Sequence, residues 1–110
     1  MFKRIDTVFV YVKNLEKATK WYQEILGLEI AMEYPGYVAF KLSETYLTLI
    51  EEDTQINRKH SSFNLYVEDI QIVHQHLRKN EVKTSEIRQD GVFHFFFYDL
   101  DGNRLEVCSF

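Results

Sequence analysis

The two halves of this 110-residue chain repeat one order of sequence patterns, which limits the possible folds more than any other feature. Each half begins with a strand-like run rich in β-branched and aromatic residues, continues into an amphipathic helical stretch, and ends in further apolar runs. At the passage from strand to helix, residues 12–15 (VKNL) match residues 67–70 (VEDI). The repetition predicts two tandem βαβββ modules produced by internal duplication.

The expected elements follow from periodicity and from residues that begin or end helices. In the first half we expect a strand at 7–12, a helix from the N-cap Asn14 to the stop at Gly27, and strands at 28–34, 37–42 and 46–50. Polar residues 51–59 connect the halves. The second half predicts a strand at 62–67, a helix from the N-cap Asp69 to a left-handed Asn80, and strands at 92–98 and 104–110 around a turn at 99–103. The length suits a single domain, 1–110, with modules of about 1–53 and 60–110.

Composition excludes several classes of function. The net charge is −4, and no Lys/Arg cluster could follow a phosphate backbone, so nucleic acid is not an expected partner. No run approaches the ~18 apolar residues of a membrane span, and no membrane partner is expected. Cys108 is the single cysteine, so an intrachain disulfide is excluded and a reducing cytoplasm is the expected location. Without an adjacent His in the sequence, Cys108 is a weak candidate nucleophile.

Alternation along the strands separates a helix-facing side from an inner side. The helix-facing positions are purely apolar, and the complementary positions combine aromatic walls with a few polar groups, as a small-molecule pocket requires. The predicted ligand-binding residues are Thr7, Phe9, Tyr11, Thr48, Ser62, Asn64, Tyr66, His94, Phe96 and Glu106. A hairpin centred on Asp101 sets Phe96 across from Glu106 and His94 diagonally near it. Glu106 and His94 are therefore candidate acid/base residues, although Glu106 can equally pair with Arg104.

Two motifs carry a family resemblance that covers the whole chain. Residues 12–28 read V-x-N-L-E-x-A-x3-Y-x3-L-G-L, and residues 98–106 read YDLDGNRLE. Together they resemble the vicinal oxygen chelate superfamily of glyoxalases, bleomycin-resistance proteins and extradiol dioxygenases. The resemblance implies an α+β fold in which two βαβββ modules form a cupped mixed sheet with the helices outside. It also implies a small-molecule ligand in a cavity and a homodimer.

Enzymes of that family hold a divalent metal with four side chains, and the resemblance places those positions at Thr7, Thr48, Ser62 and Glu106. Three of the four are hydroxyl residues, which are poor ligands for zinc, nickel, manganese or iron. Our first hypothesis is therefore a small-molecule-binding protein without metal or other cofactor. The alternatives are a metal-dependent glyoxalase-like lyase or dioxygenase that uses Glu106 with His94, or with His94 and His60, and a non-catalytic dimeric module.

Overall fold

The computed structural model describes residues 1–110 as two compact units, Met1–Ile56 and Asn57–Phe110. Each unit has the order strand, helix, strand, strand, strand, which confirms the predicted α+β fold of tandem βαβββ modules. In each unit the first and last strands pair in parallel, and the other neighbours pair antiparallel. The single domain remains a prediction. Neither helix is long and apolar enough to cross a membrane.

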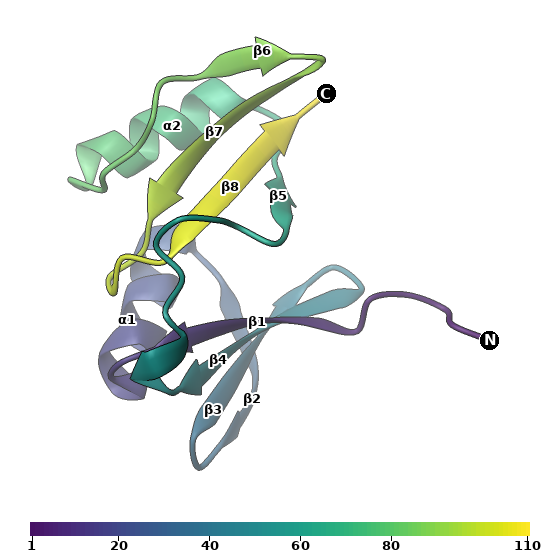
Figure 1. Ribbon diagram of the computed structural model, residues 1–110, viewed down its shortest axis with the longest axis vertical. Coiled ribbons are helices and arrows are strands. Elements are labelled where there is room, and N and C mark those ends of the chain that lie inside the picture. The colour runs from purple at the N-terminus through teal and green to yellow at the C-terminus, as the bar shows by residue number, and fades with distance from the viewer. The chain divides into compact units, whose positions relative to one another are not determined.

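The first unit is a four-stranded sheet with one helix against one face (Figure 1). Its strands are ordered β1-β4-β3-β2. Their bounds, with those of the helix, are β1 (Thr7–Val12), α1 (Leu15–Leu26), β2 (Glu29–Tyr34), β3 (Tyr37–Leu42) and β4 (Thr45–Glu51). A short 3-10 helix, η1 (Asp53–Gln55), follows in the polar connection. In this segment the Glu52 carboxylate accepts hydrogen bonds from the Thr54 hydroxyl and from the Thr54 backbone N–H. These two bonds, the first more than the second, hold the pKa of the Glu52 carboxyl below its usual range.

The two predicted caps define α1. The Asn14 side chain accepts a hydrogen bond from the Lys17 N–H at 3.0 Å, which satisfies one of the free donors of the first turn. At the other end Gly27 adopts φ 66° and ψ 25°, the left-handed conformation that glycine reaches without steric cost. Between the caps, the fully buried Ala18 and Tyr22 turn toward the sheet, where Tyr22 stacks on Phe40 at 5.9 Å between ring centroids.

The core of each unit lies between its helix and the side of its sheet that faces the helix. In the first unit the fully or almost fully buried side chains include Val10, Val12, Val38, Phe40, Leu47 and Leu49. In the second they include Phe95, Phe97, Leu105 and Val107, together with Ile70 and Leu77 of the helix. Burying each such side chain stabilises the fold by roughly 1.5–3 kcal/mol. Because strand side chains alternate, this burial fixes which residues face away from the helices.

The second unit repeats the layout with shorter strands, in the order β5-β8-β7-β6 (Figure 1). Its elements are β5 (Asn64–Tyr66), α2 (Ile70–Lys79), β6 (Arg88–Asp90), β7 (Val92–Tyr98) and β8 (Arg104–Ser109). The helix begins where predicted, with the Asp69 carboxylate accepting from the N–H groups of Gln71 and Ile72. The strand β6 has no apolar residue and is fully exposed, so a search for alternating apolar residues cannot predict it.

The start of β5 and the conformation of the residue that ends α2 differ from expectation. The strand starts at Asn64 rather than at Ser62, because local hydrogen bonds hold the preceding backbone in a turn, including one from the Ser61 hydroxyl to the Phe63 carbonyl at 2.6 Å. Asn80 is not left-handed, with φ −93°. Its N–H still bonds to the carbonyl of His76, so the chain reverses one residue later, at Glu81 with φ 61°.

The turn at 99–103 is the most specific piece of the family motif, and its side chains hold the backbone of the hairpin in place. The buried Asp99 carboxylate accepts from the N–H groups of Asp101 and Asn103 at 2.9 and 2.8 Å, and from the Asn103 side chain at 3.0 Å. Asn103 in turn accepts from the Asn57 N–H at 3.0 Å. The motif therefore closes the β7–β8 hairpin and fastens the start of the unit to it.

Candidate functional site

The open face of the first sheet, opposite α1, carries the predicted inner residues of that half. Strand pairing sets Phe9 beside Thr48, and Thr48 beside Ala39 of β3. Phe9 is half exposed at 49%, whereas Thr48 is 6% exposed. The face therefore has a polar floor between aromatic side chains. The alternation of residues 37–42 would have added Tyr37 and Ala39 to the predicted list, which omitted that strand.

Two hydroxyl groups make up this floor. The oxygens of Thr7 and Thr48 lie 2.7 Å apart, and the Thr7 oxygen lies 3.0 Å from the carbonyl oxygen of Tyr46. A carbonyl only accepts, so in the arrangement where the Thr7 hydroxyl donates its single proton to Tyr46, the Thr48 hydroxyl donates to Thr7. The Thr48 oxygen keeps an acceptor lone pair for a donor on a ligand. In this arrangement both hydroxyl protons are donated to acceptors within the protein.

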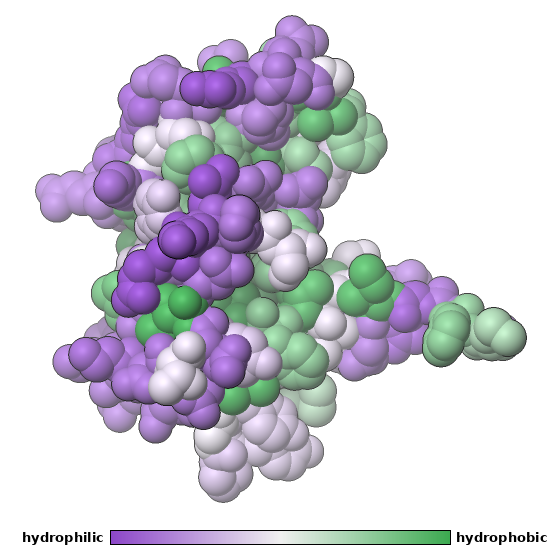
Figure 2. Space-filling model, in the orientation of Figure 1, coloured by the Kyte–Doolittle hydropathy of each residue, from purple (hydrophilic) through white to green (hydrophobic).

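Two further aromatic residues lie at the end of the same sheet. Tyr34 and Tyr37 stack at 5.0 Å between centroids at the tip of the β2–β3 hairpin, and both remain exposed. In Figure 2, hydrophobic surface of the first unit gathers over its strands, and hydrophilic surface covers the side of α1. Exposed aromatic surface of this kind is uncommon on a face without a partner or ligand.

The open face of the second sheet centres on Glu106. Strand pairing places Asn64 on one side of Glu106 and Phe96 on the other, as the predicted hairpin register requires. Arg104 lies 3.2 Å from the Glu106 carboxylate, and its guanidinium lies over the Phe96 ring at 3.7 Å from the centroid. Both charged side chains are about two-thirds buried, with exposures of 28% and 31%. Glu106 is thus held by a neighbouring cation.

His94 contacts a different carboxylate from the one suggested by the sequence. Its Nε2 lies 2.8 Å from Asp90 of β6, a strand that periodicity did not reveal. Strand pairing also sets His94 beside the buried Cys108, whose neighbour on β5 is the exposed Tyr66. Ser62 lies in the exposed turn before β5, and His60 precedes it in the same segment, where its N–H donates to Asn57.

The paired βαβββ modules define the class of fold, and comparison with known proteins gives the family. The family model described as Glyoxalase/Bleomycin resistance protein/Dioxygenase superfamily matches residues 4–107, and the chain belongs to this superfamily. A curated relative, the metallothiol transferase FosB of Staphylococcus haemolyticus, is 29% identical over 116 aligned positions covering 97% of this chain and 84% of FosB.

Two solved structures share the fold. TnmS3, an antibiotic binding protein from a Streptomyces species, superposes with a TM-score of 0.86 at 21% identity, covering 98% of this chain and 96% of its own. A variant of the fosfomycin resistance protein FosX from Listeria monocytogenes, solved with Mn(II) and a dihydroxypropylphosphonic acid, has a TM-score of 0.81 at 17% identity. The alignment covers 99% of this chain and 91% of FosX.

The residues of this chain do not fit a transition metal at the family's positions. Thr7, Thr48 and Ser62 offer only neutral hydroxyl groups at the positions that the family resemblance assigns to metal ligands. The Glu106 carboxylate is paired with Arg104 at 3.2 Å, so a metal would compete with an existing cation. Transition metals select imidazole, thiolate and free carboxylate ligands. Across the structure, no group of three or more His, Cys, Asp or Glu side chains could hold a metal ion.

Proposed function

We propose that the protein binds a small molecule on the open faces of its sheets, without a transition metal. The observation that carries the proposal is the Thr7–Thr48 hydroxyl pair, which forms a hydrogen-bonding floor beside aromatic side chains at positions that the family resemblance assigns to metal ligands. Such a surface suits a ligand with an aromatic or apolar body and a hydrogen-bond donor for Thr48. The shared fold of TnmS3, an antibiotic binding protein, agrees with a binding role.

A thermal-shift screen of aromatic compounds, combined with metal analysis of the purified protein, tests the proposal. A ligand at one hundred times its dissociation constant should stabilise the protein by about 2.7 kcal/mol. Phe9→Ala should weaken the binding of a ligand that lies on the open face of the first sheet, whereas Phe2→Ala, which removes a ring that is 96% exposed outside the sheets, should not. Equal losses in Phe9→Ala and Phe2→Ala, or stoichiometric tightly bound metal in the wild type, would overturn the proposal.

The second candidate is a metal-dependent lyase, dioxygenase or transferase with unusual ligands that include Glu106. It is favoured by the relationship to the metallothiol transferase FosB and by the fold shared with Mn(II)-bound FosX. It requires Glu106 to leave Arg104 when the metal binds. Titration with Mn(II), Zn(II), Ni(II) and Fe(II) followed by calorimetry decides between the candidates: binding that Glu106→Gln abolishes would support the second and contradict the first.

We further propose that the protein is a homodimer in the cytoplasm. Each sheet has two edge strands with unpaired backbone groups, β1 and β2 in one unit and β5 and β6 in the other. Tyr34 and Tyr66 are each about half exposed on these strands. Edges and apolar surface of this kind are commonly covered by a second copy of the chain.

A further inference from the structure

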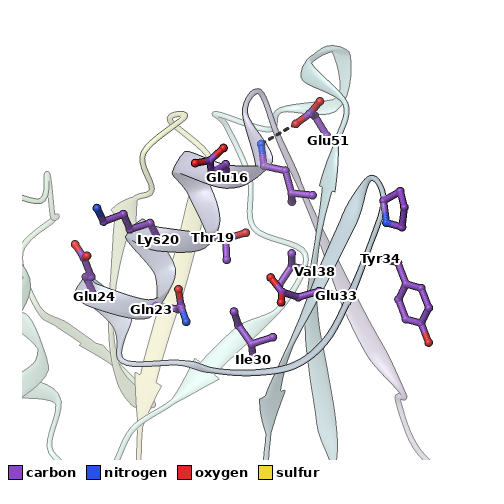
Figure 3. Close-up of a pocket in the computed structure, with 12 residues that line it drawn as sticks. Glu16, Thr19, Lys20, Gln23, Glu24, Ile30, Glu33, Tyr34, Val38 and Glu51 are labelled. Atoms are coloured by element: carbon purple, nitrogen blue, oxygen red, sulfur yellow. Dashed lines mark hydrogen bonds between the residues drawn. The ribbon is translucent and has the colours of Figure 1, made fainter.

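A groove on the helix side of the first sheet holds an unsatisfied hydroxyl group that the proposed function does not use. The groove has a volume of about 880 Å³ and runs between α1 and the strands β2 and β3 (Figure 3). Thr19 and Gln23 line it from the helix, and Ile30, Glu33 and Val38 line it from the strands. All of these residues belong to the first unit, and they face away from the Thr7–Thr48 floor.

The groove is acidic with an apolar base. Glu16, Glu24, Glu33 and Glu51 line it, and Lys20 is the one cation among the lining residues. Glu51 is engaged at one end, where its carboxylate accepts from the Leu15 N–H at 2.8 Å (Figure 3). The buried Val38 and half-buried Ile30 provide the apolar base. From Leu15 to Glu24 the helix rises about 13 Å at ~1.5 Å per residue, so the groove is elongated.

Thr19 gives a second and independent indication of a ligand. It is 8% exposed, and its hydroxyl oxygen is buried with no hydrogen-bond partner. Figure 3 shows this oxygen on the side of the helix that faces the strands. A buried hydroxyl without a partner is destabilising, whereas valine would fill the same volume without that penalty. Threonine in a helix has two accessible χ1 rotamers, and a change of about 120° from one to the other moves the hydroxyl and can present it to a group lying in the groove.

We propose that this groove binds a linear aliphatic polyamine. Ammonium groups spaced along such a chain can meet carboxylates on both sides of the groove, and the intervening methylenes can lie on Ile30 and Val38. An ammonium hydrogen also supplies the donor that the Thr19 oxygen lacks. A bare divalent metal ion fits less well, because the carboxylates are dispersed and form no cluster that could coordinate one ion.

Titration of the 15N-labelled protein with spermidine, followed by heteronuclear NMR, tests the proposal. We expect saturable shifts in the amides of α1 and β2, with affinity that falls as ionic strength rises. Each of Glu24→Gln and Glu33→Gln should weaken binding roughly two- to five-fold, as expected for exposed ion pairs. Thr19→Val should weaken it by roughly two- to ten-fold with an unchanged fold, and Thr19→Ser should restore it.

Two controls make the outcome decisive. Glu44→Gln removes an exposed carboxylate of the same unit that does not line the groove, and it should leave the affinity for spermidine unchanged. Mg²⁺ carries a double positive charge but has no extended chain that could reach carboxylates along the groove. It should therefore give weak chemical-shift changes that do not saturate. Equal effects of Glu44→Gln and Glu33→Gln, equal binding of Mg²⁺, or shifts centred on Thr48 and Phe9 would each overturn the groove site. None of these results bears on whether an aromatic ligand binds the open face.

Discussion

Thr7 and Thr48 lie on neighbouring parallel strands with their hydroxyl oxygens 2.7 Å apart. The pair forms a chain of two hydrogen bonds that ends on the Tyr46 carbonyl. Its energetic coupling can be measured directly. Thr48→Val should cost about 0.5–1.5 kcal/mol of stability, whereas Thr7→Val, which leaves the 6% exposed Thr48 hydroxyl without its acceptor, should cost roughly 1–3 kcal/mol.

The double variant Thr7→Val/Thr48→Val should cost less than the sum of the two single changes, because both partners are then replaced by apolar groups of similar shape. Urea denaturation of the four proteins gives the coupling energy. Strict additivity would show that the two hydroxyls do not interact in solution.

The same two positions should accept a designed metal site within the first unit. Thr7→His/Thr48→His places two imidazoles on one face of adjacent strands, a pair that Zn²⁺ and Ni²⁺ favour. Calorimetric titration should detect binding by the double variant and little by Thr7→His alone. A folded double variant that binds neither ion would show that the two side chains do not converge in solution.

Gly27→Val should destabilise the protein by at least ~1 kcal/mol, because φ 66° is costly for a β-branched residue. A Cβ at this position meets no atom within 4 Å, so the effect is confined to backbone strain. Gly27→Asn is the matched control, since asparagine tolerates the left-handed conformation, and it should lose less. Denaturation midpoints that do not distinguish the two variants would contradict this account.

Thr19→Val should raise the free energy of unfolding by about 1 kcal/mol in the absence of ligand. It removes an unpartnered buried oxygen while keeping the shape of the side chain and a similar helix propensity. Thr19→Ser keeps the hydroxyl and serves as the control. If Thr19→Val were instead less stable than wild type, the hydroxyl would have a partner in solution.

The proposed homodimer predicts twice the chain mass of 13.2 kDa in size-exclusion chromatography with light scattering. Substitution of Tyr34 or Tyr66 by Glu should shift the equilibrium toward monomer, if those half-exposed rings contribute to the contact. Glu86→Gln, on an exposed carboxylate outside both sheets, should have no effect. A monomeric wild type at micromolar concentration would rule out the dimer.

The sequence by itself determined the two modules, the strand faces, both helix starts and the glycine stop of α1. These features follow from local rules, because side-chain alternation and capping depend on residues a few positions apart. For the same reason the register of Phe96 with Glu106 could be predicted from the hairpin turn. The start of β5 was missed by two residues, where a side-chain hydrogen bond to the backbone competes with regular structure, and the left-handed residue after α2 was missed by one.

Only the tertiary structure decided which polar groups meet. The contact of Thr7 with Thr48 depends on a parallel pairing between residues about forty positions apart, and the contact of His94 with Asp90 depends on a strand without an apolar pattern. The groove beside Thr19 arises because α1 packs on β3 and β4, whereas β2 at the sheet edge stays largely exposed. Such arrangements depend on long-range packing and on rotamers, which a periodic pattern in one segment does not encode.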